Sequence, residues 1–133
     1  MSQPLTPDSP AIAPLARVML RAKLHRATLT GADLHYEGSC GIDQELLAAC
    51  DILPGEQIEI YNVTNGARLS TYAIAEAPGS GQITLNGSAA RHAALGDLLI
   101  ICTYAPMDDA TARAFRPRIA LLNADNRIAS MKG

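Results

Sequence analysis

The chain has 133 residues, of which 48% are hydrophobic and 18% are charged, and its formal net charge is -2 at pH 7. This length suits one domain with one core, and the composition is that of a globular protein rather than a disordered one. The small negative charge and the lack of a basic cluster argue against nucleic acid or an anionic membrane as a partner. The longest apolar runs, such as residues 98–101, are too short to cross a bilayer, so no membrane association is expected.

The first 14 residues contain Pro4, Pro10 and Pro14 among small polar residues. Such a segment gains too little from burial to offset its ordering entropy, so we expect a flexible extension over 1–14. It lacks the charged region and apolar core of a secretory signal, and we therefore expect a cytoplasmic protein. The folded domain is expected over 15–126, followed by a flexible tail at 127–133.

An alternating pattern predicts the first strand from Val18 onward. Ala22 and Leu24 would share one face of this strand, and Lys23 and His25 would lie on the other. The strand would therefore have one apolar face and one cationic face.

A short helix is expected at residues 44–49. Asp43 stands directly before it and can accept the unpaired backbone N–H groups of its first turn. The Leu-Pro-Gly sequence at 53–55 would end it.

Two alternating runs, at 58–63 and 68–74, predict a β-hairpin. Asn65 and Gly66 lie between them, and this pair is typical of hairpin turns that need positive φ angles. Further strands are expected at 82–85, 98–103 and 118–122, with an Asn-Gly turn at 86–87 and a short helix at 88–94. Many short strands and few helices favour a small closed β-barrel, which leaves no exposed sheet edge.

The three cysteines are Cys40, Cys50 and Cys102. They form no CxxC pair, and an odd number in a reducing compartment argues against a disulfide framework, so we expect buried thiols. The three histidines match no zinc-binding spacing, so no metal site is expected.

Gly38 and Ser39 are the most informative residues of the chain. A serine hydroxyl beside a glycine carbonyl can attack that carbonyl, turn the amide into an ester and eliminate the ester, which leaves an electrophilic ketone, the pyruvoyl group. Glycine suits this position because it readily enters the strained backbone angles that bring the hydroxyl against the carbonyl. A Gly-Ser pair alone is far too common to establish self-cleavage.

Separated blocks of sequence around this pair strengthen the hypothesis. They are KLHR at 23–26, ADLHYEGSC at 32–40, YNVTNG at 61–66 and STYAI at 70–74. In order and spacing they resemble the aspartate 1-decarboxylase family, pyruvoyl enzymes that make β-alanine for pantothenate, and the similarity runs from about residue 17 to about residue 126.

The resemblance implies a mainly β fold, a six-stranded double-psi β-barrel with short helices, assembled as a homotetramer. It implies scission between Gly38 and Ser39 into chains 1–38 and 39–133. A pyruvoyl group made from Ser39 would form a Schiff base with the substrate, L-aspartate, and would replace PLP or a metal as the electron sink. Some members of the family need a maturation factor, and the sequence leaves open whether this chain does.

The resemblance also assigns roles to single residues. Thr71 would hold the Gly38 carbonyl during scission and contact the substrate, and Tyr72 would return a proton to the substrate carbon, since its ordinary pKa of about 10 keeps it protonated at neutral pH. Lys23 and Arg68 would bind the two carboxylates of aspartate. Which cation meets which carboxylate stays open.

A turn after the hairpin supplies the remaining substrate contacts implied by the family: Asn86, Gly87, Ser88 and Ala89. The family usually has alanine at the position of Ser88, which leaves glutamate or another small acidic amino acid as an alternative substrate. His25 could assist maturation or Schiff-base formation, or simply pack. A barrel that never cleaves and serves as a binding module is the alternative from another class.

Overall fold

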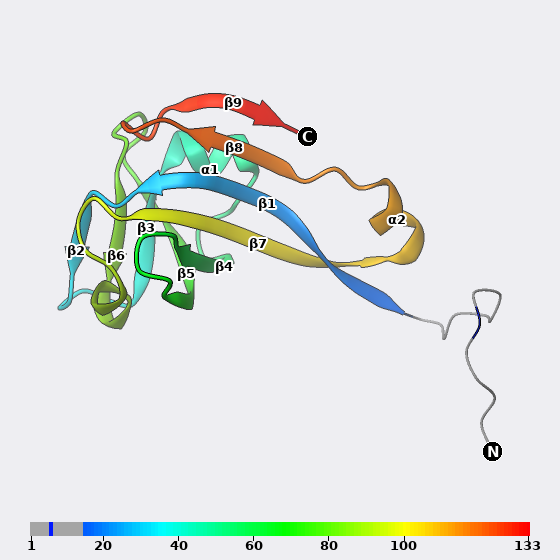
Figure 1. Ribbon diagram of the computed structural model, residues 1–133, viewed down its shortest axis with the longest axis horizontal. Helices are drawn as coiled ribbons and strands as arrows, with labels where there is room; N and C mark the ends of the chain where they lie inside the picture. The colour runs from blue at the N-terminus through cyan, green and yellow to red at the C-terminus, as the bar shows by residue number, and fades with distance from the viewer. Residues whose placement is uncertain (1–5, 7–14) are drawn as a thin grey trace, which may run out of the picture.

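The computed structural model describes residue 6 and residues 15–133, and these form one nine-stranded sheet with three short helices (Figure 1). The strands are β1 (Ala16–Thr28), β2 (Gly31–Asp33), β3 (Ser39–Asp43), β4 (Gln57–Asn62), β5 (Arg68–Glu76), β6 (Ile83–Asn86), β7 (Leu98–Asp108), β8 (Arg118–Leu122) and β9 (Ile128–Lys132). The helices are α1 (Gln44–Cys50), the 3₁₀ helix η1 (Gly87–His92) and α2 (Asp109–Ala114). The prediction of a mainly β protein with short helices is confirmed, and the arrangement is consistent with a small β-barrel.

The strand order is β2-β6-β3-β5-β4-β7-β1-β8-β9. The long strands β1 and β7 run antiparallel along the body of the molecule, and β8 lies parallel to β1 on its other side (Figure 1). In β1, Ala22 and Leu24 are fully buried, whereas Lys23 and His25 are only half-buried, as the alternating pattern predicts. Buried apolar residues of β4, β6 and β7 complete the core on this face.

Asp43 caps α1 as expected. Its side chain accepts a hydrogen bond from the Glu45 backbone N–H at 2.8 Å, and from the N–H groups of Gly79 and Gly81 at 3.0 and 2.9 Å. The helix ends at Cys50, before the predicted Leu-Pro-Gly stop, because Asp51 adopts a left-handed conformation and its N–H bonds back to the last turn.

The hairpin is confirmed, since β4 pairs antiparallel with β5 from Gln57 opposite Tyr72 to Tyr61 opposite Arg68. Its turn differs from the expected two-residue Asn-Gly turn. Of the pair only Gly66 has a positive φ, of 79°. The Asn62 side chain accepts hydrogen bonds from two backbone N–H groups of the loop, and this bonding orders a longer connection than the dipeptide alone suggests.

The C-terminal end of the chain is ordered, contrary to the expectation from the sequence. A flexible tail was expected at 127–133, but β9 pairs antiparallel with β8. The turn before β9 is held by Asn126, which is buried and bonds the backbone of Thr28 and Gly81. These bonds reach distant segments, so the local sequence could not reveal them.

The expected six strands become nine because β2, β3 and β9 were missed. β2 and β3 are short and lie beside β6, which stabilises them through pairing rather than through their own sequence. The helix expected at 88–94 is the 3₁₀ helix η1, and α2 was not predicted. The extension expected over 1–14 lies outside the described residues, apart from Thr6.

Candidate active site

Ser39 lies where an exposed loop enters the sheet. Residues 34–38 are exposed, whereas Ser39 is fully buried as the first residue of β3. β3 lies between β5, to which it is parallel, and β6, to which it is antiparallel. The Gly38–Ser39 peptide bond is therefore at the boundary between solvent and the interior, with its hydroxyl on the inner side.

Two hydrogen bonds fix the Ser39 hydroxyl. It donates to the Glu37 carbonyl at 3.0 Å, and it accepts from Nδ2 of the buried Asn86 at 3.1 Å. Ser39 and Asn86 are direct cross-strand partners in the β3–β6 ladder. A hydroxyl that has both an acceptor and a donor is held in one orientation, which is the first requirement for a defined attack.

Gly87 packs directly against the candidate scission point. Its φ is 65°, and a Cβ on Gly87 would lie 2.8 Å from both the N and Cα atoms of Gly38. A side chain at this position would therefore displace the Gly38 backbone. Sequence analysis assigned Gly87 to substrate binding, and the structure places it against the scission segment.

Gly38 does not have the left-handed backbone conformation that only glycine readily adopts. It is not among the described residues with positive φ, and a Cβ built on it meets nothing within 4 Å. Neither strain nor crowding in the intact chain therefore explains the glycine. The tight backbone contact is made by Gly87 instead.

Thr71 and Tyr72 lie on β5, next to β3. The pairing of Cys40 with Ala73 brings Tyr72 level with Ser39, and Tyr72 is 36% exposed. Thr71 pairs across β4 with the fully buried Ile58, so it lies on the core side of the strand. Among residues 15–133, no hydrogen bond joins Thr71 to the Gly38 carbonyl.

Ser88 and Ala89 follow on η1. Ser88 is exposed and Ala89 is buried, so the Ser88 hydroxyl lies away from the core. Asn86 also lines a cavity of about 300 Å³. The acidic side chains of Asp33 and Glu76 line the same cavity. These carboxylates would disfavour a dianionic ligand there.

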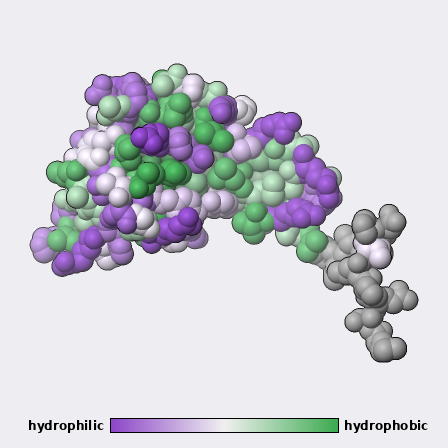
Figure 2. Space-filling view, in the orientation of Figure 1, coloured by the Kyte–Doolittle hydropathy of each residue, from purple (hydrophilic) through white to green (hydrophobic). Residues whose placement is uncertain are grey.

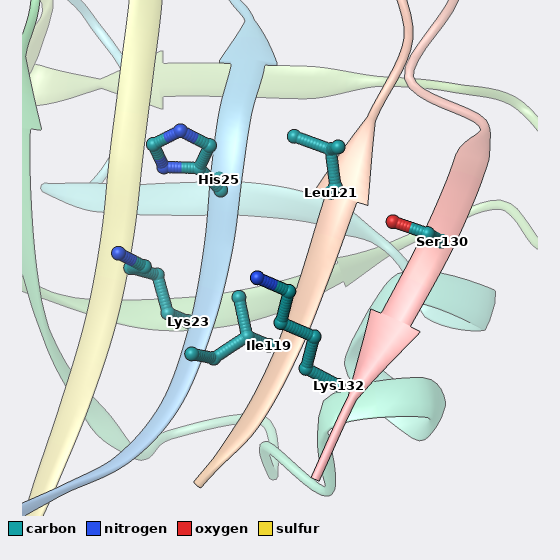
Figure 3. A pocket seen from close by; sticks show the side chains of 6 residues that line it. All are labelled: Lys23, His25, Ile119, Leu121, Ser130 and Lys132. Atoms are coloured by element: carbon teal, nitrogen blue, oxygen red, sulfur yellow. The ribbon is translucent and has the colours of Figure 1, made fainter.

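Lys23 and His25 line a different cavity, of about 330 Å³, shown in Figure 3. Its other lining residues come from β8 and β9 and are Ile119, Leu121, Ser130 and Lys132. In the strand order β5, β4 and β7 lie between β3, which contains Ser39, and β1, which contains Lys23. The predicted site residues thus form two groups within one chain.

His25 is in an unusual electrostatic setting. Burial lowers its pKa below the ordinary value, and the neighbouring cations Lys23, Arg26 and Lys132 lower it further. Its Nδ1 atom is buried and has no hydrogen-bond partner within the described part of the chain. The imidazole is therefore kept neutral with one polar atom unsatisfied.

Arg68 lies at the start of β5 with its guanidinium 4.5 Å from the centre of the Tyr61 ring. Tyr61 pairs with Arg68 on one side and with Ile100 on the other, and Ile100 pairs with His25. Direct cross-strand partners share a face of a sheet, so Arg68 and His25 lie on the same face, in one row. Stacking on Tyr61 restricts the orientation of the guanidinium.

The cysteines are all free and buried, as expected. Burial and the nearby Glu76 carboxylate raise the pKa of Cys40 to about 12, so the thiol after the scission point stays protonated and is a poor nucleophile. Within residues 15–133, no group of three or more histidine, cysteine or acidic side chains is arranged to hold a metal ion. No helix in this part of the chain is long and apolar enough to span a membrane.

Fold and site together define a small, mainly β protein with an ordered Gly-Ser junction. The family model described as aspartate decarboxylase matches residues 15–129. The chain is 65% identical over 116 residues to aspartate 1-decarboxylase of Methylibium petroleiphilum, covering 87% of this chain and 97% of that protein. It is 61% identical over 118 residues to aspartate 1-decarboxylase of Herminiimonas arsenicoxydans, covering 89% and 99%. The chain belongs to the aspartate decarboxylase family, and the resemblance seen in the sequence is confirmed.

Proposed function

We propose that this chain is the precursor of a pyruvoyl-dependent enzyme that converts L-aspartate to β-alanine and carbon dioxide, the step that supplies pantothenate and coenzyme A synthesis. The observation that carries the proposal is the Ser39 hydroxyl, fully buried and held between the Glu37 carbonyl and the Asn86 amide. It stands directly after an exposed glycine in a chain of the aspartate decarboxylase family.

Scission would begin when Ser39 Oγ attacks the Gly38 carbonyl carbon and the peptide nitrogen leaves, which converts the amide into an ester. Elimination of the ester releases Gly38 as a carboxylate and leaves a dehydroalanine, and water then replaces its nitrogen, releasing ammonia. Asn86 orients the nucleophile, and Gly87 keeps the backbone of Gly38 close to it. Thr71, assigned from the family pattern, would stabilise the charge that develops on the Gly38 oxygen.

The residues around Ser39 fit a pyruvoyl group at this position, because the Asn86 amide is a buried hydrogen-bond donor directly beside the residue that would carry the ketone. That group supplies an electron sink for loss of the α-carboxylate, so the chemistry requires no PLP or metal. Tyr72, level with Ser39 and partly exposed, is the proposed proton donor.

Two cations are proposed for the carboxylates of the substrate. Neither Lys23 nor Arg68 forms an ion pair within the described residues, and Arg68 is held over Tyr61. Each is therefore free to bind an anion. His25 is proposed as an auxiliary residue beside Lys23, and Asn86, with its neighbours on η1, as backbone contacts to the substrate.

The sharpest test is denaturing mass spectrometry of the purified protein together with carbon dioxide release from a panel of amino acids. Two fragments split after Gly38, with preference for L-aspartate over L-glutamate, support the proposal. Ser39→Ala should give one unbroken chain and no turnover, and Ser80→Ala is a matched control in an exposed loop. An unbroken wild-type chain with full activity would contradict the mechanism.

We also propose a homotetramer in the cytoplasm. Large hydrophobic side chains remain exposed, among them Val18 at 74% and Met131 at 44%. Figure 2 shows hydrophobic surface gathered in the middle of the visible face, over β1 and β8. Apolar patches of this kind are typical of association surfaces. Light scattering after size exclusion tests the assembly, and comparing scission of the purified precursor with and without cell extract tests the need for a maturation factor.

A further inference from the structure

The cavity in Figure 3 is lined by two rows of cross-strand partner residues on β1, β8 and β9. In the first row, Lys23 pairs with Ile119 of β8, and Ile119 pairs with Lys132 of β9. Because direct partners share a face of a sheet, both lysines lie on the same face, separated by one apolar residue. Figure 3 shows the Lys132 side chain extending from β9 across β8 toward β1.

The second row lies beside the first. His25 pairs with Leu121 of β8, and Leu121 pairs with Ser130 of β9. This row adds the Ser130 side chain and the His25 imidazole to the lining of the same cavity. The cavity thus has an apolar centre, with polar groups contributed from both edges.

The charges of this cavity are unbalanced. The ion pairs among the described residues involve Arg17, Arg21 and Arg113, and none involves Lys23 or Lys132. None of the acidic residues at 15–133 lines the cavity. Figure 3 shows the Lys132 ammonium lying over the apolar centre, whereas the Lys23 side chain is directed toward β7, where its row continues through Cys102 to Glu59. A small carboxylate over Ile119 would bring an anion to the Lys132 ammonium beside Lys23.

We propose that Lys132 binds a carboxylate of the substrate together with Lys23, which makes β9 part of the substrate site. Since three strands separate Lys23 from Ser39 within one chain, this site would be completed by Ser39 of a second copy in the proposed homotetramer. The inference rests on the proposed function and adds to it a residue and a strand that were not assigned any role. The ligand class is a small dicarboxylate, because one carboxylate can lie between the lysines while the other is left for a second cation. The apolar residue between the lysines would contact the carbon chain of the ligand.

The rival explanation is that Lys132 is only a solvated charge at the sheet edge, since it is exposed. The two explanations differ in what the charge does for ligand affinity. A solvated lysine can be replaced without effect on a dicarboxylate, whereas a binding lysine cannot.

The test compares Lys132→Met with Lys132→Arg and Arg116→Gln in the processed enzyme. Lys132→Met removes the charge at an exposed edge position, so the core is not disturbed. Arg116→Gln removes one charge from an exposed residue that does not line the cavity. Mass spectrometry should show complete scission in all three.

We expect Lys132→Met to raise the KM for L-aspartate and the inhibition constant of succinate about fivefold, which corresponds to about 1 kcal/mol. Its kcat should stay within about twofold, since the residue binds rather than reacts. Lys132→Arg should restore both constants to near the wild-type values, and Arg116→Gln should leave them unchanged. Constants for Lys132→Met that match those of Arg116→Gln would overturn the proposal.

Calorimetry with succinate separates this inference from the proposed function. If the wild-type chain fails to decarboxylate aspartate, the proposed function fails, yet the Kd of succinate for wild type and Lys132→Met still decides whether the cavity binds dicarboxylates. If the wild type is active and the two Kd values agree, only the role of Lys132 is wrong.

Discussion

Asn86 Nδ2 and Ser39 Oγ lie 3.1 Å apart as direct partners across the β3–β6 ladder. Both residues are buried, so the amide is directed at the hydroxyl without competition from water. The family resemblance implies substrate binding for Asn86, and the structure places its amide on the hydroxyl of Ser39, the proposed nucleophile.

Removing this amide should slow scission. In Asn86→Ala the Ser39 hydroxyl keeps its acceptor, the Glu37 carbonyl, but loses its donor, and we expect the scission rate to fall roughly tenfold to a hundredfold. The fraction of cleaved chain over time after purification, read by denaturing mass spectrometry, measures the effect. Asn65→Ala, in the exposed hairpin loop, is the control, and equal scission rates for the two variants would show that Asn86 does not orient the hydroxyl.

Gly87 and Gly66 offer a matched pair for the backbone contact. Both have positive φ, 65° and 79°, but a Cβ meets the Gly38 backbone only at Gly87 and finds nothing within 4 Å at Gly66. Gly66→Ala should therefore show only the conformational cost, roughly 1 kcal/mol in urea unfolding. Gly87→Ala should cost more and also impair scission. Similar losses of stability with normal scission would argue against a functional contact.

Asp43 should make stability depend on acid pH. Burial raises the pKa of its carboxyl, but the backbone N–H groups of Gly81, Glu45 and Gly79, together with the Arg127 charge, outweigh burial and hold the pKa below the ordinary value of 3.8. A carboxyl with a lowered pKa in the folded state contributes stability above the unfolded value, and this contribution is lost as the pH falls through the folded value.

Asp43→Asn should consequently lower the free energy of unfolding by roughly 2 kcal/mol at pH 7 and by less at pH 3. Urea unfolding at several pH values measures this difference. Asp108→Asn is the control, because Asp108 also caps a helix, α2, but is fully exposed and accepts one backbone hydrogen bond, from Thr111. A pH dependence that is the same in the two variants would contradict the account of Asp43.

Arg68 should be more sensitive than an ordinary surface charge. Arg68→Met removes a guanidinium held over Tyr61, and we expect the KM for L-aspartate to rise roughly tenfold to a hundredfold. Arg68→Lys should recover only part of this loss, because an ammonium cannot bind a carboxylate with two parallel hydrogen bonds. Steady-state kinetics of the processed enzyme provides the measurement. A KM for Arg68→Met that equals that of Arg116→Met would exclude Arg68 from substrate binding.

The local sequence pattern was sufficient to predict elements that are stabilised by residues close together in the chain. The alternation around Lys23 places this lysine on the face opposite the core, and the Asp43 cap and the β4–β5 hairpin form as predicted. In each case the physical cause, side-chain periodicity or a capping oxygen, acts within a few residues along the chain.

Elements that depend on distant partners were not predictable. β9 requires the buried Asn126 and pairing with β8, and β3 requires β5 and β6 on its two sides. The row that joins Lys132 to Lys23 was not predictable for the same reason, since it exists only after three strands are placed side by side. The contact between Gly87 and Gly38 likewise follows from the fold alone.

The position of Ser39 in the sheet order has one more consequence. Residues 1–38 contain β1, which pairs with β7 and β8, and β2, which pairs with β6. A severed N-terminal piece would therefore stay interleaved with the remainder through backbone ladders on both sides of its long strand. Under native conditions the cleaved protein would therefore elute from a size-exclusion column like the intact chain. Neither fragment would keep its fold without the other.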